Sequence, residues 1–274
     1  MLTTIGNGAE NMKKMRLVAL AHCKDEENIL QRWLKRTSEF ADGIIVVDDG
    51  STDGSFDMLK ACPKVIRVLR NPPGRPMQAL RDRNRLLNAA REAGAEWVII
   101  LDIDEIMDTR LAGRLDGLLR PGAGRVFFKE VTLWRGNEFY RVDRPDMYHR
   151  DMTMTQIIRL NPRLRWALPR EYTFPYRLAG FLKTGRFMPA PACGYMVLEG
   201  VRGDTIIVKD LVKIHYHFAD MERAWRIHMR HALREATQFK KRPGEVSEVL
   251  KWATERLDER GLKVEPVRAE WGVI

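Results

Sequence analysis

The chain lacks the features that several classes of protein require. Only three of its 274 residues are cysteines, Cys23, Cys62 and Cys193, and no two of them form a CxxC pair. This argues against a disulfide framework and against a structural zinc site, and it is typical of a protein in a reducing cytoplasm. No apolar run approaches about 18 residues, so no transmembrane helix is expected.

The N-terminal segment, residues 1–14, has no apolar stretch of the kind found in a secretory signal. It is polar, and we expect a flexible leader. Acidic residues are also fewer than basic ones, 37 against 47, which gives a formal net charge of +10. This charge is typical either of a well-solvated surface or of a protein with an anionic partner, such as nucleotide phosphates, an acidic membrane surface or nucleic acid.

Apolar residues make up 45% of the chain, which is enough to bury the core of one large domain. The first part alternates short apolar runs with segments of helical periodicity. Strands are predicted at residues 16–21, 44–47, 65–69 and 97–101, and helices at residues 29–40, 56–61 and 77–93. This order predicts an α/β fold with a mostly parallel central sheet flanked by helices.

The pattern changes after residue 108. A helix is predicted there, followed by strands without long helices between them, and then by two helices. The helices are predicted at residues 109–119, 221–239 and 245–259, and the strands at residues 126–133, 138–142, 154–160 and 205–218. We therefore divide the chain into a leader (1–14), an α/β half (15–120), a mixed half (121–218) and a C-terminal helical extension (219–274).

Two acidic clusters follow predicted strands. Asp48 and Asp49 end the run at 44–47, and Asp102 and Asp104 end the run at 97–101. A buried carboxylate costs several kcal/mol unless it is paired or bound to a metal. Ligands of open α/β sheets bind at the carboxyl ends of the strands. The two clusters therefore predict two walls of one site that holds a nucleotide and a divalent cation.

Asp102 and Asp104 alternate along the predicted strand end, so both carboxylates are expected on the same side. Two such groups, about 7 Å apart, would repel each other unless a cation lies between them or binds one of them. Mg²⁺ or Mn²⁺ bound to a diphosphate suits these hard oxygen ligands. The alternative is a helix N-cap with solvated surface acids, because a DxD pattern is short.

Residues 17–108 resemble the family 2 glycosyltransferases of the GT-A fold. The segment at 47–55, Val-Asp-Asp-Gly-Ser-Thr-Asp-Gly-Ser, is very similar to the nucleotide-binding signature of that family. Residues 24–28 lie where the family has an Asn-Glu loop, in a different order here, and Arg83-Asn84 resembles its Arg-Asn pair before the metal strand. The resemblance implies a GT-A-like nucleotide-sugar-binding half at 15–120 and an acceptor-binding, catalytic half at 121–218.

The resemblance also implies roles for single residues. Asp49 would accept hydrogen bonds from the base, and Arg83 would approach the diphosphate, unless Arg83 is only a helix-surface charge. Asp104 would be the principal metal ligand, with Asp102 near the ribose or the metal. Glu26 or Glu27 would lie near the base or the ribose. The full nucleotide-binding set implied in this way is Ala21, Cys23, Glu26, Glu27, Asp48, Asp49, Arg83, Asp102 and Ile103.

Inverting transfer to a hydroxyl needs a carboxylate that takes the proton of the acceptor. Residues 155–171 resemble a segment of some bacterial family members in which an Arg-rich strand precedes a His-Glu pair, although Arg170 replaces the histidine here. Glu171 is therefore the candidate catalytic base. The alternatives are that Glu171 pairs with a nearby arginine, or that another acid is the base, namely Asp143, Asp146 or Asp151.

His215 and His217 end the apolar run at 205–218 and would share one face of a strand. Their position before the last helices resembles the place where related enzymes supply a late metal ligand. Imidazole accepts Mn²⁺ more readily than Mg²⁺. We therefore predict metal ligation by one of them, with His215 favoured, and a purely structural role is the alternative.

The predicted helix at 221–239 has two stripes. Basic residues recur on one, at Arg223, Arg226, Arg230 and Arg234, and apolar residues on the other, at Trp225, Met229, Ala232, Ala236 and Phe239. We expect the apolar stripe to dock on the core and the basic stripe to be solvated. The alternative for the basic stripe is contact with anionic lipid headgroups or with an anionic glycan acceptor.

The predicted function is transfer of a sugar from a nucleotide-diphosphate sugar to a hydroxyl of a glycan or lipid-linked acceptor, with Mn²⁺ or Mg²⁺ as cofactor. The family resemblance implies a UDP-sugar donor, inversion and polysaccharide biosynthesis. We expect a cytoplasmic protein, with peripheral contact at the inner face of the membrane as a further option.

Two other function classes are alternatives to glycosyl transfer. Nucleotidyltransferases that make nucleotide sugars carry a Gly-rich phosphate loop after the first strand, where this chain has residues 22–25, His-Cys-Lys-Asp. A basic nucleic-acid-binding module would need exposed aromatic residues and no carboxylate pocket. The acidic clusters argue against nucleic acid as a partner.

Overall fold

The computed structural model describes residues 15–75, 78–143, 156–169, 196–237, 247, 251 and 257–273. The expected leader, the candidate base Glu171 and most of the second predicted tail helix lie outside these residues.

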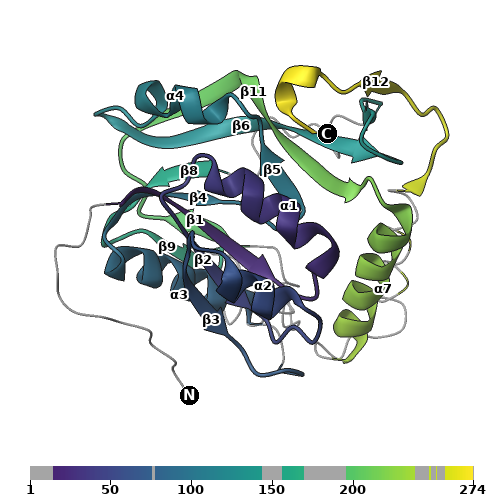
Figure 1. Cartoon of the computed structure of the whole chain (residues 1–274), viewed down its shortest axis with the longest axis horizontal. Helices are drawn as coiled ribbons and strands as arrows, with labels where there is room; N and C mark the ends of the chain where they lie inside the picture. Colours follow the sequence, from purple (N-terminus) through teal and green to yellow (C-terminus); the bar gives the residue numbers. More distant parts are fainter. Residues whose placement is uncertain are drawn as a thin grey trace, which may run out of the picture.

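The first half has the predicted alternation of strands and helices (Figure 1). Each strand is an apolar run and each helix follows it with one apolar face, as the sequence periodicity indicates. The elements are β1 (Met15–Cys23), α1 (Glu27–Ser38), β2 (Gly43–Asp48), α2 (Ser55–Ala61), β3 (Val65–Arg70), α3 (Ala79–Glu92) and β4 (Ala95–Ile100). β1 pairs in parallel with both β2 and β4, and β2 pairs in parallel with β3. The prediction of a mostly parallel core is confirmed.

The second half extends this sheet with strands of both directions. β8 pairs antiparallel with β4 and β6, and β6 pairs in parallel with β11. β9 and β10 form a separate antiparallel pair. The elements are β5 (Glu105–Met107), α4 (Leu111–Leu118), β6 (Ala123–Trp134), β7 (Phe139–Arg141), β8 (Gln156–Arg159), β9 (Arg165–Ala167), β10 (Val197–Glu199), β11 (Asp204–Phe218), α7 (Met221–Thr237), β12 (Val264–Pro266) and the 3-10 turn η2 (Ala269–Trp271). The short strands β5, β9, β10 and β12 were not predicted.

Two apolar layers cover the two faces of the sheet. Alternate residues of β1 point to opposite faces. Leu17 and Ala19 join the cluster formed with α1, α4 and β6, whereas Val18 and Leu20 join the cluster formed with α3 and β9. The central strands are therefore buried on both faces, which explains their continuous apolar runs.

The long strand β11 brings the end of the second half against the first half. It pairs with β6 along most of its length and antiparallel with β5 near its end, where His215 lies opposite Glu105. Residues 213–217 thereby reach the carboxyl end of β4, because β5 follows β4 after a single turn.

The C-terminal extension begins as the predicted helix α7 but does not stay helical. β12 pairs antiparallel with β7. The 3-10 turn η2 then places Trp271 against Tyr140, with ring centroids 5.3 Å apart, and Trp271 is only 4% exposed. Trp271 thereby belongs to the main core cluster, together with Tyr140.

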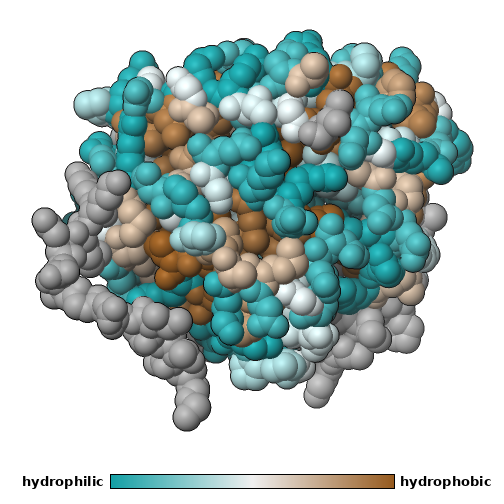
Figure 2. Space-filling view, viewed as in Figure 1, coloured by the Kyte–Doolittle hydropathy of each residue, from teal (hydrophilic) through white to brown (hydrophobic). Residues whose placement is uncertain are grey.

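The predicted orientation of α7 is wrong. Arg223, Ala224 and His228 are buried, whereas Trp225 and Met229 are each 43% exposed. Arg223 is drawn inward because it pairs with two carboxylates, and that pairing overrides the apolar periodicity of the helix. In Figure 2, apolar residues appear as small separate patches on a surface that is mostly hydrophilic.

Among the described residues, no helix has both the length and the apolar character that crossing a bilayer requires.

The two tryptophans provide a matched test of this arrangement. We expect Trp271→Ala to lower the free energy of unfolding by about 3–5 kcal/mol, because it empties a buried aromatic site. Trp225→Ala should change it by less than about 0.5 kcal/mol, because that ring is largely exposed. Urea unfolding of both variants measures the difference, and equal losses would contradict the burial described for Trp271.

Candidate active site

The two acidic clusters lie at the same edge of the sheet. β1 is hydrogen-bonded between β2 and β4, and all three strands run in parallel, so their carboxyl ends are neighbours. The loop after β2 and the turn after β4 therefore lie on either side of the end of β1 (Figure 1). This is the arrangement of two walls that the sequence predicted.

The loop after β2 is fixed by its own acids. Asp48 is fully buried and its Oδ1 accepts the Ser51 N–H at 3.2 Å. Asp49 donates its N–H to the Cys23 carbonyl at 2.9 Å, and its Oδ1 accepts Asn71 Nδ2 at 2.9 Å. Gly50 has φ +70°, and a Cβ there would lie 2.7 Å from the Pro73 Cα, so the turn requires glycine. Asp48 thus has a structural task in the loop, while Asp49 lies at its half-buried rim.

Glu26 and Glu27, the two acids after β1, have different surroundings. Glu27 joins the loops, because its Oε2 accepts the Gly54 N–H at 2.9 Å and its N–H donates to Asp53 at 3.1 Å. Glu26 Oε2 instead lies 2.8 Å from Arg223 Nη2. Burial raises the pKa of Glu26, although Arg223 opposes that shift. Of the two, Glu26 is the one that faces the centre of the site.

The turn after β4 corrects one prediction. β4 ends at Ile100, so Asp102 and Asp104 lie in a turn and not on a strand, and the argument from strand alternation is wrong. The Asp102 N–H donates to Glu105 Oε2 at 3.0 Å. The Ile103 side chain is 4% exposed and belongs to the core, so only its backbone could reach a ligand.

Two groups of side chains in the described part of the chain could bind a metal ion. One of them consists of predicted ligands only, namely Asp104, His215 and His217. Their ligand atoms all lie within 4.8 Å of one another. Asp104 Oδ2 is 3.5 Å from His215 Nε2 and 3.4 Å from His217 Nδ1. Asp102 does not belong to this cluster. One carboxylate and two imidazoles suit a divalent ion that accepts nitrogen ligands.

The charges of this cluster are strongly coupled. Burial alone would raise the pKa of Asp104, but the facing charges of His215 and His217 outweigh it and hold that pKa well below its usual range. Burial would lower the pKa of His215, yet Asp104 and Glu130 raise it to about 10. His217 has its pKa lowered by burial. The Asp104 carboxylate is therefore stabilised in its charged form.

Arg223 was not predicted as a site residue. It is 8% exposed, and its Nη1 lies 3.5 Å from Asp104 Oδ2 while its Nη2 contacts Glu26. Arg223 connects the loop after β1 with the turn after β4, although it lies 197 residues after Glu26 in the sequence. Its position in a basic stripe was visible in the sequence, but its inward direction was not.

A second group of polar side chains meets at a small cavity beside Asp102. The cavity is lined by Leu20, His22, Arg83, Leu86, Ile100, Asp102 and Trp166. His22 Nε2 is buried and has no hydrogen-bond partner, and the Arg83 guanidinium lies over the Trp166 ring at 5.2 Å. Burial, with a smaller contribution from Arg83, lowers the pKa of His22 to about 4. Arg83 and Asp102 are thus close together, as implied, and His22 is an unpredicted member of the group.

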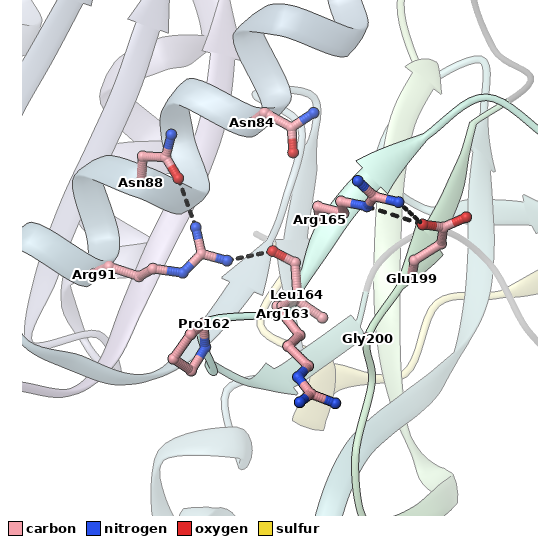
Figure 3. Close-up of a pocket in the computed structure, with 9 residues that line it drawn as sticks. All are labelled: Asn84, Asn88, Arg91, Pro162, Arg163, Leu164, Arg165, Glu199 and Gly200. Carbon is pink, nitrogen blue, oxygen red and sulfur yellow. Dashed lines mark hydrogen bonds and ion pairs between the residues drawn. The ribbon is translucent and has the colours of Figure 1, made fainter.

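Asn84, the neighbour of Arg83, anchors β9. Its Oδ1 accepts the Trp166 N–H and its Nδ2 donates to the Trp166 carbonyl, each at 2.9 Å. Figure 3 shows the larger pocket below it, of about 580 Å³, where Arg91 donates to the Leu164 carbonyl and Arg165 pairs with Glu199. These contacts link α3 to the β9–β10 pair.

The candidate bases are only partly described. Glu171, Asp146 and Asp151 lie outside the described residues. Asp143 is held by Arg141, with Oδ1 and Nε 2.7 Å apart. Burial alone would raise the pKa of the Asp143 carboxyl, but its hydrogen bonds, foremost the one from Arg141, together outweigh burial, so this pKa is lowered. Asp143 is thereby engaged in an ion pair on β7's side of the sheet.

Ala21 and Cys23, the remaining implied residues, lie on β1, where they pair with Val46 and Asp48. Both side chains are buried. Burial, followed by the charge of Asp48, raises the pKa of Cys23 to about 12, so it is an unreactive thiol. These residues can contribute backbone groups at the edge of the site.

Residues 22–156 match the model of the family described as Glycosyl transferase family 2. They form a family 2 glycosyl transferase domain. The chain is an enzyme of this kind, as its loops after β1, β2 and β4 predicted. This finding argues against the nucleic-acid-binding module and favours glycosyl transfer over nucleotidyl transfer. No curated protein matches the chain.

Several solved glycosyltransferase structures are similar in fold. TarS residues 1–349 from S. aureus is 14% identical, with 86% of this chain and 69% of that chain covered, at a TM-score of 0.45. The mannosyltransferase PcManGT from Pyrobaculum calidifontis, in complex with GDP-Man and Mn²⁺, is 17% identical, with 87% and 69% covered, at 0.44. The glucosyl-3-phosphoglycerate synthase from Mycobacterium tuberculosis, in complex with Mn²⁺, UDP and glucosyl-3-phosphoglycerate, is 17% identical, with 57% of this chain and 63% of that chain covered, at a TM-score of 0.35.

The buried His22 gives a pH dependence that can be measured. In the unfolded chain the ring takes up a proton below about pH 6.5, whereas in the folded protein it does so only near pH 4. The stability that the neutral ring contributes is therefore present above pH 6.5 and is lost as the pH falls toward 4. Urea unfolding in EDTA should show a steeper loss over this range for the natural protein than for His22→Gln. Identical pH profiles would contradict the buried, neutral ring.

Proposed function

We propose that the enzyme transfers a sugar from a nucleoside-diphosphate sugar to a hydroxyl of a glycan or lipid-linked acceptor, with a divalent cation at Asp104. The observation that carries this proposal is the cluster of Asp104, His215 and His217 at the carboxyl edge of the sheet, where the loop with Glu26 lies next to it and the loop with Asp49 lies beyond that loop. Such a site can hold the diphosphate end of a donor while the nucleoside lies over the end of β1.

The donor atoms fit Mn²⁺ better than Mg²⁺, because two of the three are imidazole nitrogens. When bound, the cation would neutralise charge that develops on the leaving diphosphate. Asp104, His215 and His217 would hold it.

The other residues would bind and orient the donor. Asp49 is placed at the rim to accept hydrogen bonds from the base. Arg83 lies beside Asp102 with its guanidinium over Trp166, which supports a role for Arg83 toward the diphosphate and for Asp102 toward the ribose. Glu26 is held by Arg223 at the boundary between these groups.

The transfer would invert the configuration of the sugar, with Glu171, which lies outside the described residues, as the base. Asn84 fixes Trp166 on β9, five residues before Glu171 in the sequence. Contact with an anionic membrane stays a prediction. The exposed side chains of Trp225 and Met229, next to Arg226 and Arg230, would suit such a contact.

A thermal shift panel tests donor and metal together. The protein is heated with UDP, GDP, dTDP, CMP or ADP, each with Mn²⁺, Mg²⁺ or EDTA. At a nucleotide concentration one hundred times the dissociation constant, binding stabilises the folded state by about 2.7 kcal/mol. We expect one nucleoside diphosphate to raise the melting temperature with Mn²⁺ and to lose this effect in EDTA. No shift with any nucleotide would argue against the proposal.

A substitution at the cluster tests the metal ligand directly. We expect Asp104→Asn to lower donor turnover by about 100-fold or more, because several kcal/mol of charge stabilisation are lost and each 1.36 kcal/mol is tenfold in rate. The Mn²⁺-dependent thermal shift should disappear as well. Asp116→Asn is the control, since that side chain is 93% exposed and remote in the fold. Retained turnover in a folded Asp104→Asn protein would contradict the assignment.

A further inference from the structure

A buried ion cluster lies directly behind the predicted metal ligands. We propose that Glu130 is a positioning residue for the metal site: held by the buried Lys213, it accepts the Nδ1–H of His215 and leaves Nε2 of that ring directed at Asp104. This inference rests on the proposed metal site and adds the residues that orient it.

Lys213 is the centre of the cluster. It is 1% exposed on β11, and its Nζ lies 2.6 Å from Glu130 Oε2 on β6 and also pairs with Glu105 on β5. Both glutamates are 7% exposed. A buried ammonium is very unfavourable unless its donors are satisfied, and here two carboxylates satisfy it. Their facing charges hold the pKa of Lys213 above its usual range although burial opposes this.

The strand register brings these side chains together. Lys213 is paired with Glu130 across β11 and β6, and His215 is opposite Glu105 across β11 and β5. Lys213 and His215 are two residues apart on one strand and so share a face. The cluster is thus produced by three adjacent strands and does not depend on a flexible loop.

Two glutamates carry one more charge than a single lysine neutralises, and the remaining acceptors have defined partners. Glu130 Oε1 lies 3.2 Å from His215 Nδ1, and Glu105 Oε2 accepts the Asp102 N–H at 3.0 Å. One glutamate therefore holds the histidine, and the other holds the turn that carries Asp104. Lys213 joins them, so it fixes the two sides of the metal site relative to each other.

The direction of the His215 ring follows from this contact. An imidazole that donates Nδ1–H to a carboxylate presents its other nitrogen, Nε2, as the ligand atom. His215 Nε2 is the atom that faces Asp104, at 3.5 Å. His217 uses the opposite atom, because its Nε2 lies 3.3 Å from His228 Nε2 and its Nδ1 faces Asp104.

Lys213 also decides where a cation can bind. Glu105, Glu130 and His215 form a second group whose ligand atoms lie within 4.8 Å of one another. The Lys213 ammonium already contacts both of its carboxylates, so this group carries its own cation. The metal is thereby directed to the Asp104 side of His215.

The experiment compares Mn²⁺ affinity in Glu130→Gln and in the natural protein, from the electron paramagnetic resonance signal of free Mn²⁺. The amide nitrogen of the glutamine cannot accept a hydrogen bond, so it can no longer serve both His215 and Lys213. Loss of such a partner behind a metal ligand typically weakens metal binding by about 10–100-fold, and we expect a loss in that range.

The matched control is Asp108→Asn. Asp108 is 1% exposed, follows β5 directly and pairs with Arg110, so it is another buried carboxylate of this region without contact to His215. We expect it to lower the melting temperature in EDTA and to leave the Mn²⁺ dissociation constant within twofold. If Glu130→Gln does not fold, Glu130→Asp replaces it, since it keeps the charge beside Lys213 but is one methylene too short to reach both partners.

The outcomes separate the two proposals. Mn²⁺ binding by the natural protein and an unchanged dissociation constant in folded Glu130→Gln or Glu130→Asp would overturn the positioning role and leave the proposed function standing. A loss of affinity equal to that in Asp108→Asn would also overturn it. No Mn²⁺ binding by the natural protein, with or without nucleoside diphosphate, would overturn both proposals.

Discussion

The buried negative charge behind and around Asp104 is the constraint on which the rest of the site depends. Four carboxylates, of Glu26, Asp104, Glu105 and Glu130, come together at the edge where β5 meets β11. Charges in such surroundings are tolerated only when they are paired and hydrogen-bonded. Lys213 and Arg223 supply two fixed positive charges, and His215 faces the carboxylates on either side of it. The negative charge still exceeds the fixed positive charge, which favours a divalent cation over any neutral ligand at this place.

The same requirement orients the end of the chain. α7 presents Arg223 to Asp104 and Glu26, and this turns Trp225 and Met229 outward although apolar periodicity favours the opposite orientation. An ion pair with two buried carboxylates stabilises one rotation of the helix more than the half-burial of two apolar side chains would stabilise another. Beyond β6 the core includes Trp271 of η2, whose ring packs against Tyr140 of β7, the strand that pairs with β12.

Local patterns and distant contacts differ in how far the sequence predicts them. Strand and helix alternation and the shared face of His215 and His217 depend on neighbours in sequence, and the structure has both of them. The pairing of Lys213 with Glu105 depends on residues 108 positions apart, so no local periodicity could predict it. A charged residue inside each apolar run, Glu130 in one and Lys213 in the other, was the available signal. Glu27 and Asp48 show the converse, because both belong to the family signature, yet both satisfy backbone groups of the loops.

The ion cluster is better explained by the site than by stability. Replacing a buried ion pair by apolar residues of similar volume is often neutral or stabilising. The stability of the fold therefore does not explain why a lysine lies between two glutamates on three adjacent strands. Apolar residues at these positions would leave the core intact, but they would leave the Nδ1 of His215 without an acceptor and the Asp102 N–H without its partner. Either ring nitrogen of His215 could then carry the proton, and the turn with Asp104 would lose its tie to β11. The charged cluster therefore selects one ring orientation and one turn position at the same time, which is the geometric precision that a metal site requires and a hydrophobic core does not supply.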